Sequence, residues 1–181
     1  MIKFLLHRIV ARMERRYDYD ATYLHELVDI SPTAARRYVK AQTAGRWQGP
    51  APRDAWHAAS IGGALVEDCG PCVQIATDIA VEAGMAPATI EALLAGRDAD
   101  PDAKLGFDYA RALLSGAEDF EELRETVMRR FGRQGLVALS MMAMYSRNFP
   151  VLKRALGHAK TCQRVRVGGA EVAVAQALKA A

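Results

Sequence analysis

The spacing of the apolar residues constrains this chain most, because they recur at three- and four-residue intervals along almost the whole sequence. Residues 2–16 show the pattern clearly, with six apolar side chains on one helical face: Ile2, Leu5, Leu6, Ile9, Val10 and Met13. A strand is plausible only at Val165-Arg166-Val167, just before Gly168-Gly169, which is too short to change the fold class. With 51% apolar residues the chain can bury a real core, so we predict an all-α globular protein.

Prolines and glycines divide the helical pattern into segments. Ser31-Pro32 is typical of a helix start, with an N-cap residue followed by proline at the first helical position. The segment from Gly45 to Pro50 breaks the pattern and is the best candidate boundary between an N-terminal helical arm (1–46) and the main helical domain with its C-terminal tail (50–181). Beyond the boundary we expect helices at about 52–66, 70–84, 87–95, 102–115, 118–131, 134–147, 150–159 and 171–180.

Charge and hydropathy exclude several partner classes. A net charge of +3 is too small to argue for nucleic acid, and no apolar stretch approaches the roughly 18 residues that a membrane span needs. The apolar opening is broken by His7 and Arg8, and no small-residue cleavage site follows, so we expect a cytoplasmic protein. The basic face of the first helix is typical of a solvated surface, with contact to anionic lipid as the weaker alternative.

The most informative motif is Cys69-Gly70-Pro71-Cys72, at the start of a predicted helix. A Cys-x-x-Cys pair brings two sulfurs close enough to bridge, and the free N–H groups and dipole of a helix start favour thiolate over thiol. Thiolate attacks a disulfide or a peroxide oxygen, and the second thiol then resolves the adduct as an intramolecular disulfide. Three cysteines, an odd number, do not make the disulfide framework of a secreted domain.

Two other interpretations of the cysteines stay open at this stage. In the first interpretation, the sulfurs are inert and have only a structural role. In the other, Cys69, Cys72, His158 and Cys162 supply a Cys₃His zinc site, since His158 and Cys162 stand at i and i+4. Nothing local brings those two halves together, and Cys162 is more simply a packed or spare thiol. We therefore expect no metal and no cofactor.

The chain resembles the alkylhydroperoxidase D-like branch of the carboxymuconolactone decarboxylase superfamily over roughly residues 50–158. The resemblance rests on these segments: Asp54-Ala55-Trp56-His57, the cysteine pair with its helix to Gly84, Phe107–Leu114, Arg130-Phe131-Gly132, and the apolar helix leading to Asn148. It implies an all-α multi-helix bundle, oligomers built by packing apolar helices, and a Cys-x-x-Cys cycle that reduces hydroperoxides.

The sequence departs from the redox members of that family at two positions. They carry His four residues after the second Cys, where this chain has Ala76, and Glu twelve residues before the first Cys, where it has His57. An imidazole is a suitable base near neutral pH, so His57 is a candidate for the proton relay, and Glu67 is a second. Each also has a plain structural interpretation, since His57 can fill space beside Trp56 and Glu67 can complement a helix dipole.

The sequence thus favours a thiol-dependent oxidoreductase that acts on a hydroperoxide or a disulfide partner, with Cys69, Cys72, His57 and Glu67 as site residues. A thioredoxin-like or other dithiol would donate the electrons, and a homo-oligomer is expected. The alternative is a non-catalytic interaction or ligand-binding module that kept the fold and lost the relay. The substrate, the attacking cysteine, the oligomer size and the job of residues 1–45 stay open.

Overall fold

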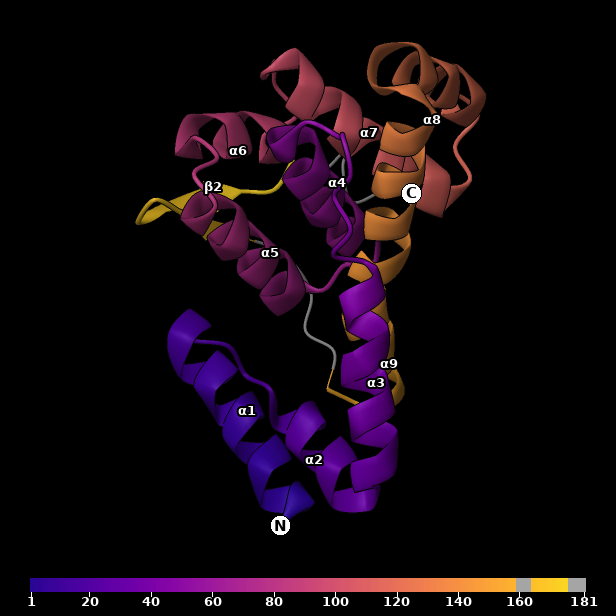
Figure 1. The fold of residues 1–181 in the computed structure, drawn as a ribbon. Coiled ribbons are helices and arrows are strands. Elements are labelled where there is room, and N and C mark those ends of the chain that lie inside the picture. Colours follow the sequence, from indigo (N-terminus) through magenta and orange to yellow (C-terminus); the bar gives the residue numbers. More distant parts are fainter. Residues whose placement is uncertain (159–163, 176–181) are drawn as a thin grey trace.

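The computed structural model describes residues 1–158 and 164–175, and within these ranges the chain forms nine helices and one β-hairpin (Figure 1). The arm contains α1 (Ile2–Tyr17), α2 (Thr22–Ile30) and α3 (Pro32–Ala44). The main part contains α4 (Arg53–Val66), α5 (Gly70–Glu82), α6 (Pro87–Leu94), α7 (Pro101–Ser115), α8 (Phe120–Ser146), α9 (Asn148–Ala155), β1 (Arg164–Val167) and β2 (Ala170–Ala173). The predicted all-α character is confirmed as a mostly helical fold.

The helix expected at 171–180 is wrong over its described part. Ala170–Ala173 is strand β2, which pairs antiparallel with β1, and residues 176–181 lie outside the described ranges. Gly168 and Gly169 both have positive φ (56° and 93°), a conformation that glycine adopts without strain and that turns the chain back in two residues. The short strand predicted at residues 165–167 is confirmed as part of β1.

Hydrogen bonds to its main-chain groups fix the hairpin to the helices. The Gln74 side chain of α5 donates to the Arg166 carbonyl (2.9 Å) and accepts from the Arg166 N–H (2.7 Å). After β2, the Ala175 N–H donates to the Leu94 carbonyl at the end of α6 (2.9 Å). Val165 and Val167 are buried in the same cluster as the cysteine pair, so the hairpin closes one side of that core.

The centre of the molecule is a close packing of α4 on α7 through residues without large side chains. A Cβ at Gly106 would lie 2.1 Å from the Ala55 carbonyl oxygen, and one at Gly62 would lie 2.6 Å from the Phe107 carbonyl oxygen. Glycine lets two helices approach this closely because it brings no side chain to the crossing. The buried face of α8, including Ala138, Leu139 and Ala143, completes this core.

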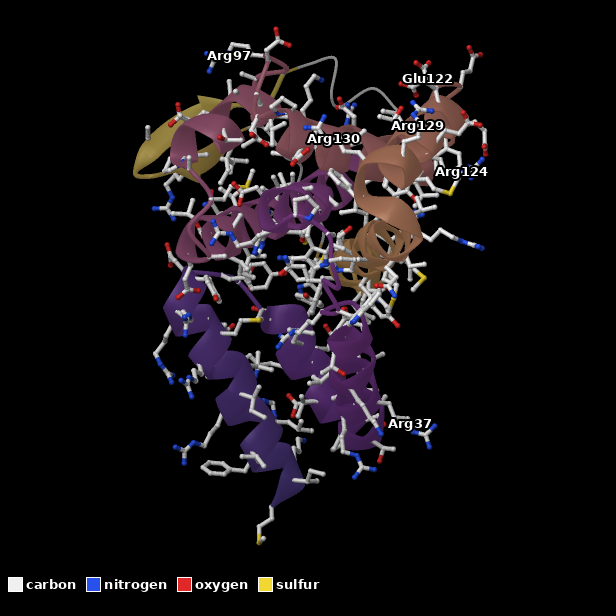
Figure 2. The ribbon with its side chains drawn as sticks, turned by 45° about the horizontal axis from the view of Figure 1, so that its top comes forward. Arg37, Arg97, Glu122, Arg124, Arg129 and Arg130 are labelled. Carbon is white, nitrogen blue, oxygen red and sulfur yellow. A yellow bond between two sulfur atoms is a disulfide. The ribbon has the colours of Figure 1, made fainter. Side chains whose placement is uncertain are left out.

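Gly132 divides α8 into two helical segments. This agrees with the sequence prediction of separate helices at 118–131 and 134–147. The φ of 72° and ψ of 177° at Gly132 are not helical. Figure 2 shows Arg124, Arg129 and Arg130 on the first segment, at the opposite end of the molecule from Arg37 of the arm. Arg130 forms an ion pair with Asp102 at the start of α7. The first segment is thereby tied to α7.

The arm packs as a three-helix unit against the rest of the chain (Figure 1). Leu6, Val28 and Ala35 form a small core between its helices, and the Ser31 hydroxyl caps α3 by accepting from the Ala34 N–H (3.2 Å), as predicted. Tyr38 of α3 meets Phe149 of α9 edge-on, with ring centroids 5.5 Å apart. The turn at residues 45–50 lies where the boundary was expected, and the two-domain division itself stays a prediction. No helix in the described ranges is long and apolar enough to cross a membrane.

Candidate dithiol site

The cysteine pair lies in the turn between α4 and α5. Asp68 has a positive φ of 47°, a left-handed conformation that aspartate tolerates better than most residues, and it directs the chain from one helix into the next. Cys69 is the N-cap of α5, and its carbonyl accepts from the N–H groups of Cys72 and Val73 (both 2.9 Å). The two sulfurs form a disulfide, with the Cα atoms 5.2 Å apart, and each cysteine is only 3% exposed.

A tyrosine from the arm contacts the disulfide. The Tyr19 hydroxyl lies 3.9 Å from Cys72 Sγ and 3.1 Å from the Tyr23 hydroxyl. A disulfide sulfur has no proton, so in this contact the tyrosine is the donor. Burial raises the pKa of Tyr19 to about 12, and it raises the pKa of Tyr23 further. Both phenols therefore keep their protons at neutral pH.

Lys153 of α9 lies behind these two rings. Its ammonium group is 4.8 Å from the centre of the Tyr19 ring and 5.4 Å from the centre of the Tyr23 ring, and it donates to the Asp20 carbonyl (3.1 Å). The residue is 1% exposed. A cation near a thiol favours the thiolate, and water screens a buried cation less than an exposed one. Cys72 thus has a hydroxyl donor and, one ring further away, a positive charge.

Glu67, predicted as a proton shuttle, is held by two arginines. Its side chain is 4% exposed and forms ion pairs with Arg147 and with Arg154, the latter at 2.7 Å. Each carboxylate oxygen therefore accepts from a guanidinium group. Glu67 precedes Cys69 by two residues, but in this structure its described partners are arginines rather than sulfurs.

His57 lies at the far end of the helical hairpin from the cysteines. The helices α4 and α5 run antiparallel, since Arg53 at the start of α4 donates to the Gly84 carbonyl beyond the end of α5 (3.5 Å). The last residue of α4, Val66, lies nine positions after His57, which is a rise of about 14 Å at about 1.5 Å per residue. The His57 ring packs edge-on against Trp56, with centroids 5.0 Å apart, and burial lowers its pKa. The structure therefore does not bring His57 to the sulfurs.

The structure describes three of the four residues of the zinc alternative. Cys69 and Cys72 are bonded to each other, and His158 pairs with Glu26 (2.7 Å). Cys162 lies outside the described ranges. Residues 1–158 and 164–175 contain no group of three or more His, Cys, Asp or Glu side chains arranged to hold a metal ion.

Sequence reasoning found the two cysteines and missed Tyr19, Tyr23 and Lys153. One available signal was Lys153 itself, which directly follows four apolar residues, Phe149-Pro150-Val151-Leu152. Ala76, where the resemblance expects histidine, is buried one turn after Cys72. Comparisons of the chain with known protein families, with curated proteins and with solved structures return no match.

Proposed function

We propose that this chain is a thiol-dependent oxidoreductase of the alkylhydroperoxidase D-like type, in which Cys69 and Cys72 cycle between dithiol and disulfide. The observation that carries the proposal is the Cys-x-x-Cys pair bonded at the start of α5, with the Tyr19 hydroxyl 3.9 Å from Cys72 Sγ. Thiol chemistry of this kind belongs in a reducing compartment, so we assign the protein to the cytoplasm.

The short span of the bridge supports a redox role over a purely structural one. The two cysteines are three residues apart, so the disulfide closes a very small loop. In the chain-entropy treatment a loop of about four residues stabilises a fold by about 2 kcal/mol, against about 4.7 kcal/mol for a loop of about 100 residues. This bridge therefore stabilises the fold less than a disulfide that closes a long loop, as expected for a pair that opens and closes in a redox cycle.

The proposed reaction balances without a cofactor. One thiolate attacks the terminal oxygen of a hydroperoxide, the O–O bond breaks, and the departing alkoxide takes a proton to become an alcohol. The sulfenic acid left on that cysteine is attacked by the second sulfur, which forms the disulfide and releases water. A dithiol donor of the thioredoxin class then reduces the disulfide by exchange.

Tyr19 and Lys153 are proposed to stabilise a thiolate at Cys72, in a chain that has Ala76 at the position of the family histidine. At neutral pH the Tyr19 hydroxyl is protonated, so it donates a hydrogen bond to a thiolate at Cys72 and stabilises that charge. The Lys153 ammonium acts in the same direction through the ring. In this proposal Glu67 anchors the turn through its arginines, and His57 takes no part.

The proposed homo-oligomer is supported by apolar side chains left exposed on α8. Val137 is 48% exposed and Met144 is 49% exposed. Seven residues separate them, so they lie on the same face of the helix. A second copy packed along this face would cover both, as the resemblance implies.

The test measures peroxide consumption by the reduced protein with tert-butyl hydroperoxide and a dithiol reductant. We expect Cys69→Ser and Cys72→Ser each to abolish turnover. Tyr19→Phe should slow it about 13-fold, which corresponds to about 1.5 kcal/mol, the lower end of the range for one hydrogen bond to a charged group. Tyr17→Phe is the matched control, because its hydroxyl donates to Glu82 instead (2.9 Å). Wild-type protein without turnover, or a cysteine variant at the wild-type rate, refutes the proposal.

A non-catalytic ligand-binding or interaction module is the second candidate. The observations that favour it are the burial of both sulfurs and the distance of His57 from them. Thiol titration of the reduced protein separates the two candidates. The inert buried thiols of a module would titrate at or above the ordinary cysteine pKa of about 8.5, whereas the redox proposal requires one thiol well below it.

A further inference from the structure

Helix α1 exposes half of the apolar face that its sequence predicts. Leu6 and Val10 of that face are buried in the arm. Four large apolar side chains of the helix are exposed: Ile2, Phe4, Leu5 and Ile9. Phe4 is 68% exposed and Leu5 is 58% exposed. A single exposed apolar residue is ordinary, whereas a group of them on one short segment is typical of an interaction site.

The end of α2 extends this apolar surface. Asp29 forms an ion pair with Lys3 (2.8 Å), so the end of α2 lies beside the start of α1. The next residue, Ile30, is 67% exposed. Figure 1 shows the start of α1 at the end of the arm that lies furthest from the main helices. The exposed apolar residues therefore gather toward the outer end of the arm.

The exposed side of α1 is also basic. Arg8 and Arg12 stand three and seven residues after Leu5, on the same side of the helix, and Arg15 continues the row. All three arginines are exposed, and none of them forms an ion pair within residues 1–158 and 164–175. The carboxylate of α1, Glu14, faces α2, where it accepts from the Ala21 N–H (3.1 Å) and lies 3.0 Å from a ring nitrogen of His25.

The net positive charge of the chain comes from the arm. Residues 1–46 contain nine Lys and Arg against five Asp and Glu, whereas the whole chain contains 24 against 21. A second copy fits the exposed side of α1 poorly, because a symmetric contact would bring this surface against itself and offer the arginines no carboxylate. An anionic bilayer offers both kinds of contact, with hydrocarbon for the apolar residues and anionic head groups for the arginines.

We propose that α1 binds the surface of an anionic lipid membrane, with Phe4 and Leu5 at the boundary between head groups and acyl chains. Helices of this kind lie in the plane of the interface with their apolar residues about 5–10 Å deep, and basic residues strengthen the attachment to anionic lipid. Arg8, Arg12 and Arg15 supply that attraction. This surface goes beyond the proposed redox function and does not depend on it.

The test measures co-sedimentation of the full chain with lipid vesicles. One set contains about 30% phosphatidylserine in phosphatidylcholine, and the other contains phosphatidylcholine alone and has no anionic surface. We expect about 100-fold weaker binding to the second set, because each of three arginines contributes about fivefold at an anionic surface. Raising the salt from about 0.1 M to about 1 M shortens the Debye length from about 10 Å to about 3 Å and should weaken binding to the anionic vesicles.

A pair of charge variants locates the basic contact. Arg8→Gln combined with Arg12→Gln should weaken binding to the anionic vesicles about 30-fold, or about fivefold per arginine. The matched control combines Arg97→Gln with Arg129→Gln and should bind like the wild type. Figure 2 shows Arg97 and Arg129 at the opposite end of the molecule from the start of α1.

A second pair of variants locates the apolar contact. Leu5→Gln should weaken binding about tenfold, the value of one apolar side chain at the lower end of its range. Met128→Gln is the matched control, because Met128 is also exposed but belongs to the first segment of α8. Since all the substituted side chains are exposed, each variant should fold, which thermal unfolding verifies.

Three results would overturn the proposal. The first is absence of binding to the anionic vesicles, and the second is equal binding to phosphatidylcholine alone. The third is binding that the α1 variants leave unchanged. Sedimentation equilibrium tests the other occupant, since loss of a homo-oligomer in Leu5→Gln would make this surface a contact between copies and refute the membrane site. Peroxide turnover is not part of the readout, so the result is independent of the dithiol proposal.

Discussion

Replacing Glu67 by glutamine separates a structural role of this carboxylate from a chemical one. Glu67 accepts from Arg147 and Arg154 at a site where its own side chain is 4% exposed. The substitution keeps the size of the side chain and removes the charge that holds both arginines. We therefore expect a loss of stability with little change in thiol chemistry.

The size of the effect follows from the exposure of the partners. Hydrogen bonds to charged groups contribute about 1.5–3 kcal/mol each, while exposed ion pairs contribute about 0–1 kcal/mol. Arg147 and Arg154 are 39% and 55% exposed, so we take a value between these ranges. Two such interactions at about 1 kcal/mol each give a loss of about 2 kcal/mol. For a chain of this size that lowers the melting temperature by about 4–8 °C.

The assay is thermal unfolding followed by circular dichroism at pH 7, with the disulfide oxidised in every sample. Asp68→Asn is the matched control, because the next carboxylate is exposed and asparagine also tolerates the left-handed conformation. An unchanged melting temperature in Glu67→Gln refutes the anchoring role. If Glu67→Gln loses peroxide turnover at an unchanged melting temperature, Glu67 acts in proton transfer rather than as an anchor.

Two further predictions concern His57 and the crossing of α4 and α7. Burial lowers the His57 pKa below its ordinary 6.5, so the unfolded state binds more protons than the folded state as the pH falls through 6.5 and below, and stability is lost in that window. His57→Phe should remove this part of the loss, measured by urea unfolding at about pH 7 and about pH 5, and an unchanged difference between the two pH values contradicts it. Gly106→Ala places a Cβ 2.1 Å from the Ala55 carbonyl oxygen, which should lower the free energy of unfolding by about 3 kcal/mol. Gly116→Ala, with no neighbour within 4 Å, should lose only about 1 kcal/mol from its left-handed φ, and equal losses in the two variants would refute the close-approach argument.

Most helix positions were predictable because their signals are local. Ser31-Pro32 starts α3, Pro87 starts α6 and Gly132 interrupts α8, each through its own backbone preference. The tail was not predictable in this way. The spacing of Val172 and Val174 is compatible with a helix or a strand. The hairpin turn and the core against which both residues pack determine that this segment is a strand.

The candidate site shows the same division between local and distant information. Cys69 and Cys72 are evident from their spacing and from the helix that follows. Tyr19 contacts Cys72, which is 53 residues away in the sequence, and Lys153 contacts the Tyr19 ring from still further along the chain. The spacing of apolar residues does not predict such long-range contacts. The family pattern directed attention to His57, but antiparallel packing of α4 and α5 separates it from the sulfurs.

The two hydrogen bonds between Gln74 and β1 also bear on aggregation through the edge of the hairpin. A two-stranded ribbon leaves the outer N–H and C=O groups of each strand open to pairing with strands of other molecules. Here both outward groups of Arg166 are occupied by one side-chain amide, which imitates a neighbouring strand over a single residue. Gln74 of α5 thus occupies the place of a neighbouring strand at Arg166, so a strand from another molecule cannot pair with β1 at that residue.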